Sequence, residues 1–350
     1  MAHRNTLSVL SSGRRRVSLL EASAILGIVT LLAACLFPII AQARESAKNA
    51  SHLTRYRVAC LANAMYVSDY DGDDDLVPSG VHGRKETNRP GGQAGGGGGG
   101  FPIAYHGGPI ITGTVNVYYI WYGNWSGNSA TTILPDLASN IGGKPYFNIN
   151  TTYYDGSGNH VQNLVTNKLS TTDNYSQGTA FGDAGVQAIV ANAINSGKLQ
   201  ADANGVYFVL TSADVNETSG FCTQYCGWHT HVKTTSIANG MDIKYAFVGN
   251  PDRCPSACEA QTTGPNGNAG ADGMASIIAH ELEEATTDPD LNAWFDRRGA
   301  ENADKCAWTF GTTYTTSNGA KANMKLGTRD FLIQQNWVNV NGGYCAKQYP

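Results

Sequence analysis

Residues 272–287 read DGMASIIAHELEEATT, and this stretch has the spacing of an amphipathic helix. Its large apolar side chains recur every three to four residues, so on a helix they form one stripe: Met274, Ile277, Ile278 and Leu282. A stripe of this width packs against a sheet or another helix. We therefore expect this helix to lie against the core, with its polar residues at the edge of the stripe.

The polar positions of the same helix have the spacing of metal ligands. His280 and Glu284 are four residues apart, so both side chains point the same way and can reach one ion. Glu281 projects about a third of a turn away, where the general base of metal hydrolase sites holds the attacking water. Residues 280–284 differ by one residue from the His-Glu-x-x-His signature of zinc hydrolases, because Glu284 stands in place of the second histidine.

A third ligand is expected from a later element, and Glu301 and Asp304 follow at a suitable distance. Zinc is the expected metal, with calcium as the alternative, because two carboxylates make a site more open to hard cations. The competing interpretation is a solvated helix face without metal. It is less favoured because His280 directly follows three apolar residues. Three further histidines are spare ligand candidates: His106, His229 and His231.

The composition is that of a folded chain. Of the 350 residues 41% are hydrophobic and 15% charged, and the net charge is −4. Residues 1–100 carry 11 Lys and Arg against 8 Asp and Glu, whereas residues 101–350 carry 13 against 20. An acidic main domain excludes nucleic acid as a partner, because phosphate binding needs a basic face. Cations are the more natural ligands.

Residues 101–350 contain alternating strand-like and helix-like segments. Aromatic and β-branched runs predict strands at 115–122, 206–210 and 243–248, and residues 331–340 alternate like a closing strand. Helical spacing is found at 130–140 and 183–196, before the motif helix. This order predicts an α/β domain, a mixed sheet with flanking helices and a zincin-like motif helix.

The N-terminal part has the features of a membrane anchor. Residues 22–41 are almost wholly apolar, and about 20 such residues suffice to cross a bilayer as a helix. Arg14, Arg15 and Arg16 precede them and would keep the N-terminus in the cytoplasm. A cleaved signal peptide is the alternative. The expected domains are a cytoplasmic basic leader (1–16), an anchor helix with an acidic turn (17–75), a glycine-rich linker (76–100) and an extracytoplasmic domain (101–350).

The anchor region also resembles the N-terminal helix of bacterial type IV pilin-like proteins. If Val17 were the first mature residue, Glu21 would be the fifth, as in that family, and Pro38 would stand where many pilins have proline. The sequence departs from the pattern at the cleavage point, where Arg16 replaces glycine. This resemblance implies anchoring at a cell surface and offers a pilus subunit as a third hypothesis.

A second resemblance covers the main domain. It is carried in collinear order by YHGGP (105–109), YIWYGNW (119–125), FCTQYCGWH (221–229), VGNP (248–251), CPSAC (254–258), DGM (272–274), AHELEE (279–284), NAW (292–294), ADKC (303–306) and YC (344–345). Residues 104–347 thereby resemble the exordium / phosphate-induced protein 1 family. The resemblance implies an extracellular protein, in plants one linked to growth and cell expansion. It implies a fold and a compartment rather than a reaction.

The main domain carries six cysteines, an even number that indicates disulfides in an exported protein. Among 15 possible pairings we prefer Cys222–Cys226, Cys254–Cys258 and Cys306–Cys345. The rival hypothesis is a four-thiolate zinc site built from the first two pairs. It requires a reducing compartment, which the anchor argues against.

Two functions follow from these observations. The first is a surface-anchored, metal-dependent hydrolase acting on peptides, with Glu281 as base and His280, Glu284 and Asp304 or Glu301 as ligands. The alternative is a non-catalytic extracellular module that binds cell-wall polysaccharide or a surface partner. Sugars would stack on four tryptophans: Trp121, Trp125, Trp228 and Trp294. The sequence leaves open whether the protein is an enzyme.

Overall fold

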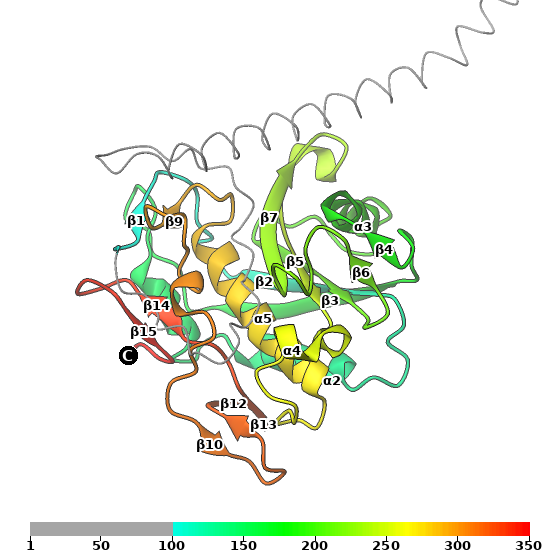
Figure 1. Cartoon of the computed structure of the whole chain (residues 1–350). Coiled ribbons are helices and arrows are strands. Elements are labelled where there is room, and N and C mark those ends of the chain that lie inside the picture. Colours follow the sequence, from blue (N-terminus) through cyan, green and yellow to red (C-terminus); the bar gives the residue numbers. More distant parts are fainter. Residues whose placement is uncertain (1–100) are drawn as a thin grey trace, which may run out of the picture. The chain divides into compact units, whose positions relative to one another are not determined.

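A five-stranded sheet forms the centre of the fold (Figure 1). The fold comes from a computed structural model, which describes residues 101–350. The strand order is β3 (Val165–Asp173), β2 (Val115–Tyr122), β5 (Gly205–Thr211), β8 (Asp242–Gly249) and β7 (Gly227–Lys233). The first four strands are parallel, and β7 pairs antiparallel with β8 at the edge. The sheet is therefore mixed, as expected.

Helices cover both faces of this sheet. They are α2 (Ala130–Asn140), α3 (Asp183–Asn195), the single-turn α4 (Pro255–Cys258) and α5 (Ala269–Thr287). Side chains alternate along a strand, so Tyr119 and Tyr122 of β2 point to opposite faces. The Tyr119 hydroxyl donates to Leu134 O of α2, whereas the Tyr122 ring contacts Phe181, just before α3. Helices α2 and α3 thus lie on opposite faces.

Helix α5 carries the motif and is the most deeply buried helix of the described residues. It packs against α2 and against strands β7 and β8, and it crosses the centre of the molecule in Figure 1. Asn268 caps its start by accepting the backbone N–H of Ala271. Every residue from 274 to 287 is buried, including the polar ones. An apolar stripe alone would have left the polar side of the helix in solvent.

Short two-stranded ribbons surround the sheet. They pair β1 (Ala104–Tyr105) with β9 (Trp294–Phe295), β4 (Ala180–Phe181) with β6 (Asn216–Glu217), β10 (Tyr314–Thr315) with β11 (Lys321–Ala322), β12 (Met324–Leu326) with β13 (Arg329–Phe331), and β14 (Asn336–Val338) with β15 (Tyr344–Ala346). Short 3₁₀ helices are η1 (Phe147–Thr152), η2 (Ala238–Gly240), η3 (Pro251–Arg253) and η4 (Asp304–Cys306). A second, smaller core lies around Trp294 and Trp337.

The central elements agree with the expectations from sequence, and three segments do not. Strands β3 and β7 were not expected, because β3 is polar and β7 carries two histidines. The expected strand at 331–340 is wrong: β13 ends at Phe331 and β14 spans only Asn336–Val338. The chain between them turns inward, where Gln334 Oε1 accepts the backbone N–H of Trp308.

No helix within residues 101–350 is long and apolar enough to cross a membrane. The predicted leader, pilin-like anchor helix, acidic turn and glycine-rich linker all fall in residues 1–100, outside the described residues.

Three disulfides are present, and two of the preferred pairings are wrong. The bonds are Cys222–Cys254, Cys226–Cys258 and Cys306–Cys345. The single turn of α4 presents Cys254 and Cys258 on one side, toward the turn that carries Cys222 and Cys226. Two parallel bonds with Cα–Cα distances of 5.7 and 5.6 Å result. The four-thiolate zinc site is also wrong, because all four sulfurs are oxidised.

Peptide mapping tests this pairing. Cleavage of the denatured, unreduced protein after Tyr225 separates Cys222 from Cys226. We expect mass spectrometry to find both resulting peptides joined to the peptide that contains Cys254 and Cys258, because each cysteine bonds across to that segment. Two peptides joined only to each other would contradict the structure. The Cys306–Cys345 bond, which both pairings share, serves as the internal control.

Candidate metal centre

A glycine brings strand β7 into close contact with helix α5. A Cβ atom at Gly227 would lie 2.5 Å from Cγ2 of Ile277 and 3.1 Å from Oε1 of Glu281. Only a residue without a side chain permits this approach. His229 follows two residues later on the same face of the strand, so its imidazole lies over the motif turn of α5.

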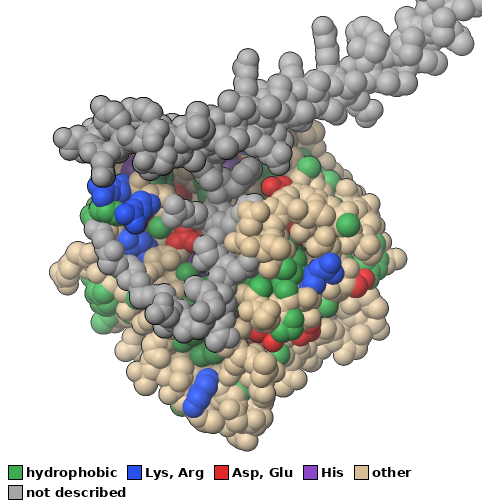
Figure 2. Space-filling view, in the orientation of Figure 1, with side chains coloured by type: hydrophobic (Ala, Val, Ile, Leu, Met, Phe, Trp, Pro, Cys, Tyr) green, Lys and Arg blue, Asp and Glu red, His purple; other side chains and the backbone are tan. Residues whose placement is uncertain are grey.

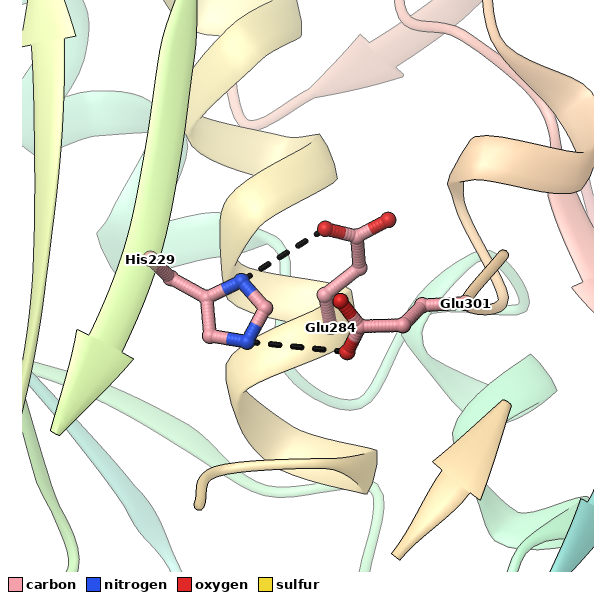
Figure 3. Close-up of side chains that lie close together, drawn as sticks. All are labelled: His229, Glu284 and Glu301. Atoms are coloured by element: carbon pink, nitrogen blue, oxygen red, sulfur yellow. Dashed lines mark ion pairs between the residues drawn. The ribbon is translucent and has the colours of Figure 1, made fainter. Parts of the chain in front are cut away.

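His229 contacts three carboxylates in a fully buried environment, and Figure 3 shows two of them, those of Glu284 and Glu301. Its Nδ1 lies 3.3 Å from Oε2 of Glu281 and 3.5 Å from Oε2 of Glu284. Its Nε2 lies 3.6 Å from Oε1 of Glu301 and 3.4 Å from the carbonyl oxygen of Asp288. These carboxylates come from two elements, α5 and the segment that follows β9.

Glu284 lies between the two histidines. Its Oε1 is 3.0 Å from Nε2 of His280, one helical turn earlier, while its Oε2 faces His229. The backbone N–H of Asp304 donates to the same Oε1 at 3.0 Å, and Asp304 Oδ1 lies 3.8 Å from His280 Nε2. Glu284 is therefore the residue that both halves of the cluster share.

The segment carrying Glu301 and Asp304 is held in place by an ion pair. Lys305 donates through Nζ to Oδ2 of Asp296 at 3.0 Å, and both side chains are buried. The other carboxylate oxygen of Asp296 accepts the backbone N–H groups of Arg298 and Ala300. These contacts join the two ends of the loop between β9 and η4. The loop conformation that results directs Glu301 toward α5.

The cluster contains more acidic than basic groups. Four carboxylates meet two imidazoles: Glu281, Glu284, Glu301 and Asp304 surround His229 and His280. In residues 101–350 no Lys or Arg forms an ion pair with Glu281, Glu284 or Glu301, and nearby Lys305 pairs with Asp296. Burying carboxylates without a cation costs several kcal/mol each. A bound cation would remove that cost.

Burial and neighbouring charges shift the acidities of these groups in opposite directions. Burial raises the pKa of Glu281, and it raises that of Glu301 well above its usual range. Burial acts in the same sense on Glu284, but the His280 charge and the contacts with both histidines hold its pKa at about 2. Burial by itself would lower the pKa of His229, but the surrounding carboxylates, Glu301 first, raise it well above its usual range. Glu284 is thus the carboxyl most firmly held as an anion.

The side of α5 that carries Glu283 has polar partners of its own, and these hold the helix in position. Asn336 donates through Nδ2 to Oε2 of Glu283 at 2.6 Å, and Asn302 donates to the backbone oxygen of Glu283. Asn150 accepts from both asparagines through Oδ1. Glu283 therefore serves the packing of the helix rather than the cluster.

The structure brings together all five residues selected from the sequence. His280, Glu281, Glu284, Glu301 and Asp304 lie in one cluster, in which the first four are buried and Asp304 is partly exposed. That they bind a metal stays a prediction.

His229 was only a spare candidate, because β7 was not expected as a strand. Its place in the segment 221–229, one of the segments that carry the family resemblance, was the available signal. His106 stacks on Phe295 at the surface, and His231 contacts Asp242 and Asp290 in a separate group.

The donor atoms fit a divalent ion. Ligands at 2.0–2.2 Å from a tetrahedral ion are separated by roughly 3.4 Å. The nitrogen–oxygen distances here run from 3.0 Å for His280–Glu284 to 3.8 Å for His280–Asp304. An imidazole ligand favours zinc over calcium, because calcium takes oxygen ligands.

The proposed sugar-stacking tryptophans are part of the core. Trp121, Trp125, Trp228 and Trp294 are each at most 7% exposed. Where hydrophobic side chains of the described residues are visible in Figure 2, they form small separate patches. The expectation that these four rings bind polysaccharide is therefore wrong.

Comparison with known proteins identifies relatives along most of the domain. A family profile described as "Phosphate-induced protein 1 conserved region" matches residues 103–331. Protein EXORDIUM-like 3 of Arabidopsis thaliana is 30% identical over 282 residues, covering 70% of this chain and 82% of that protein. Protein PHOSPHATE-INDUCED 1 of Nicotiana tabacum is 26% identical over 218 residues, covering 55% and 67%. No solved structure matches the chain.

Gly227→Ala tests the contact between β7 and α5. The added methyl group would press on Ile277, Glu281 and the carbonyl oxygen of Phe247 at 2.9 Å. We expect the free energy of unfolding, measured by urea denaturation, to fall by about 1–3 kcal/mol. Gly156→Ala is the matched control, because its nearest neighbour would lie at 3.5 Å. Equal effects of both substitutions would contradict the close approach at Gly227.

Proposed function

This chain belongs to the phosphate-induced protein 1 family, and we propose that its domain is an extracytoplasmic, metal-dependent hydrolase of peptides. His280 and Glu284 would hold zinc, with Asp304 as the third ligand and Glu301 as its alternative. The single observation that carries the proposal is the buried cluster of four carboxylates and two imidazoles, in which no Lys or Arg ion-pairs with the three glutamates.

Each residue of the cluster has a distinct role. A bound zinc ion supplies a Lewis acid that polarises a carbonyl group and lowers the pKa of water to about 7. Glu281 accepts the proton of the attacking water. Its Oε1 accepts no hydrogen bond from the described residues, and its raised pKa suits a general base. Asp304, with a side chain 10% exposed, marks the most open side of the cluster.

The disulfides support the proposed compartment. Three bonds within residues 101–350 fit an oxidising environment outside the cytoplasm. We place the domain at the cell surface, with residues 22–41 as its membrane anchor; the pilin-like origin of that segment belongs to the same proposal.

A second function has its own observation in its favour. His229, His280, Glu281 and Glu284 are each at most 1% exposed, so the centre is closed to large substrates in this conformation. A structural metal ion would then stabilise a non-catalytic module that binds a cell-wall or surface partner. Binding to the folded state alone would raise its stability by mass action.

Glu281→Gln separates the two functions. Under the hydrolase proposal the amide cannot accept a proton, so cleavage of unstructured synthetic peptides falls about 10²–10⁴-fold, measured by mass spectrometry. Zinc content and melting temperature stay within error of the wild type. Chelation removes cleavage as well, and added zinc restores it.

Glu259→Gln is the control, because this buried carboxyl lies next to Asp252, outside the cluster. Its peptide cleavage should equal that of the wild type. Zinc that raises the melting temperature of a wild-type protein without peptide cleavage would support the structural role. A protein that binds no metal would contradict both functions.

A further inference from the structure

The cluster contains two sets of ligands that share one carboxylate. One set gathers around His280, with Oε1 of Glu284 at 3.0 Å and Oδ1 of Asp304 at 3.8 Å. The other gathers around His229, where Oε2 of Glu284 lies 3.5 Å from Nδ1 and Oε1 of Glu301 lies 3.6 Å from Nε2. One ligand atom from each of these three residues lies within 4.8 Å of the other two, so a single ion can reach all three. Each set has its own histidine and its own additional carboxylate, and the two oxygens of Glu284 face different histidines.

We propose that the cluster binds two divalent cations, bridged by the carboxylate of Glu284. His280 and Asp304 complete the first site, and His229 and Glu301 complete the second. This rests on the proposed metal-dependent function and adds a second ion to it. Glu281, which contacts His229, stays available as the base between the two sites.

The charge balance supports two ions rather than one. Four carboxylates, Glu281, Glu284, Glu301 and Asp304, carry four negative charges when ionised. Two divalent cations neutralise them with both histidines neutral, as metal binding requires. A single divalent cation would leave two negative charges in an environment that is almost closed to solvent. Uncompensated charge at that depth is costly.

The alternative is a single ion with His229 as a buried imidazolium. A charge-assisted hydrogen bond between nitrogen and carboxylate is about 2.7–2.9 Å long. The four contacts of His229 are all longer, from 3.3 to 3.6 Å. Furthermore, Oε2 of Glu284 and Oε1 of Glu301 accept no hydrogen bond from the described residues, although both are buried. Nitrogen and oxygen atoms at these distances fit two ligands of one metal ion better than they fit the donor and acceptor of a hydrogen bond.

Two-ion centres have a chemical consequence for the substrate. In hydrolases two ions act on both the attacking and the leaving group of a single displacement, as in aminopeptidases and phosphatases. The domain carries 20 Asp and Glu against 13 Lys and Arg, so its field repels phosphate esters. A peptide substrate is consistent with both features.

Metal stoichiometry tests the inference directly. The full-length chain is purified without chelator or metal-binding tag, depleted, dialysed against zinc and analysed by elemental mass spectrometry. We expect two zinc ions per chain in the wild type, and about one in His229→Ala and in His280→Ala. Glu284→Ala loses both or binds each at least 10-fold more weakly. His160→Ala, a substitution of an exposed histidine, should keep two.

A second measurement needs no substitution in the cluster. Wild-type protein loaded with Mn²⁺ should show the electron paramagnetic resonance spectrum of an exchange-coupled pair, because a shared carboxylate links the ions. Two uncoupled ions would overturn the bridge. Loss of one ion in the His231→Ala variant would also overturn the bridge. It would show that the second ion is bound beside His231, Asp242 and Asp290.

The outcomes separate this inference from the proposed function. One zinc ion per wild-type chain, lost on His280→Ala and kept on His229→Ala, would overturn the two-ion centre and leave the one-metal proposal intact. No zinc at all would overturn both.

Discussion

The burial of charge along helix α5 is the constraint on which the rest of this structure depends. A helix with His280, Glu281, Glu283 and Glu284 within five positions would ordinarily expose most of them to water. Here every one is at most 1% exposed. Desolvating such groups is costly unless each is paired or bound to an ion. The surrounding elements are arranged to meet that requirement, with asparagines on one side and histidines on the other.

The elements that meet it come from distant parts of the chain. Strand β7 contributes His229 from the antiparallel edge of the sheet, and Gly227 lets it approach the helix. The disulfide at Cys226 fastens the start of that strand to α4, shortly before α5 begins. The loop after β9, closed by the Lys305–Asp296 pair, brings Glu301 and Asp304. Covalent bonds and one buried ion pair thus hold the residues of the cluster in place.

The sequence predicted the mixed α/β core because its strands and helices carry strong local patterns. The strand at 115–122 and the helix at 130–140 have the same bounds in the structure. Strand β3 was missed because it lies at an edge of the sheet, where exposed polar residues replace the apolar pattern. The pairing of Cys222 and Cys226 was wrong because neighbours in sequence face a second segment that only folding brings close.

For the site, the sequence by itself determined that His280 and Glu284 lie close together on α5, since helical spacing places them on one side. It also indicated Glu301 and Asp304 as candidates for a third ligand, because they follow the helix along the chain. Only the tertiary structure decided that His229 joins them, because strand β7 pairs with β8 through contacts between residues far apart in sequence. It alone decided that the cluster is buried. Burial depends on all the elements that pack around a helix, so a local sequence pattern does not predict it.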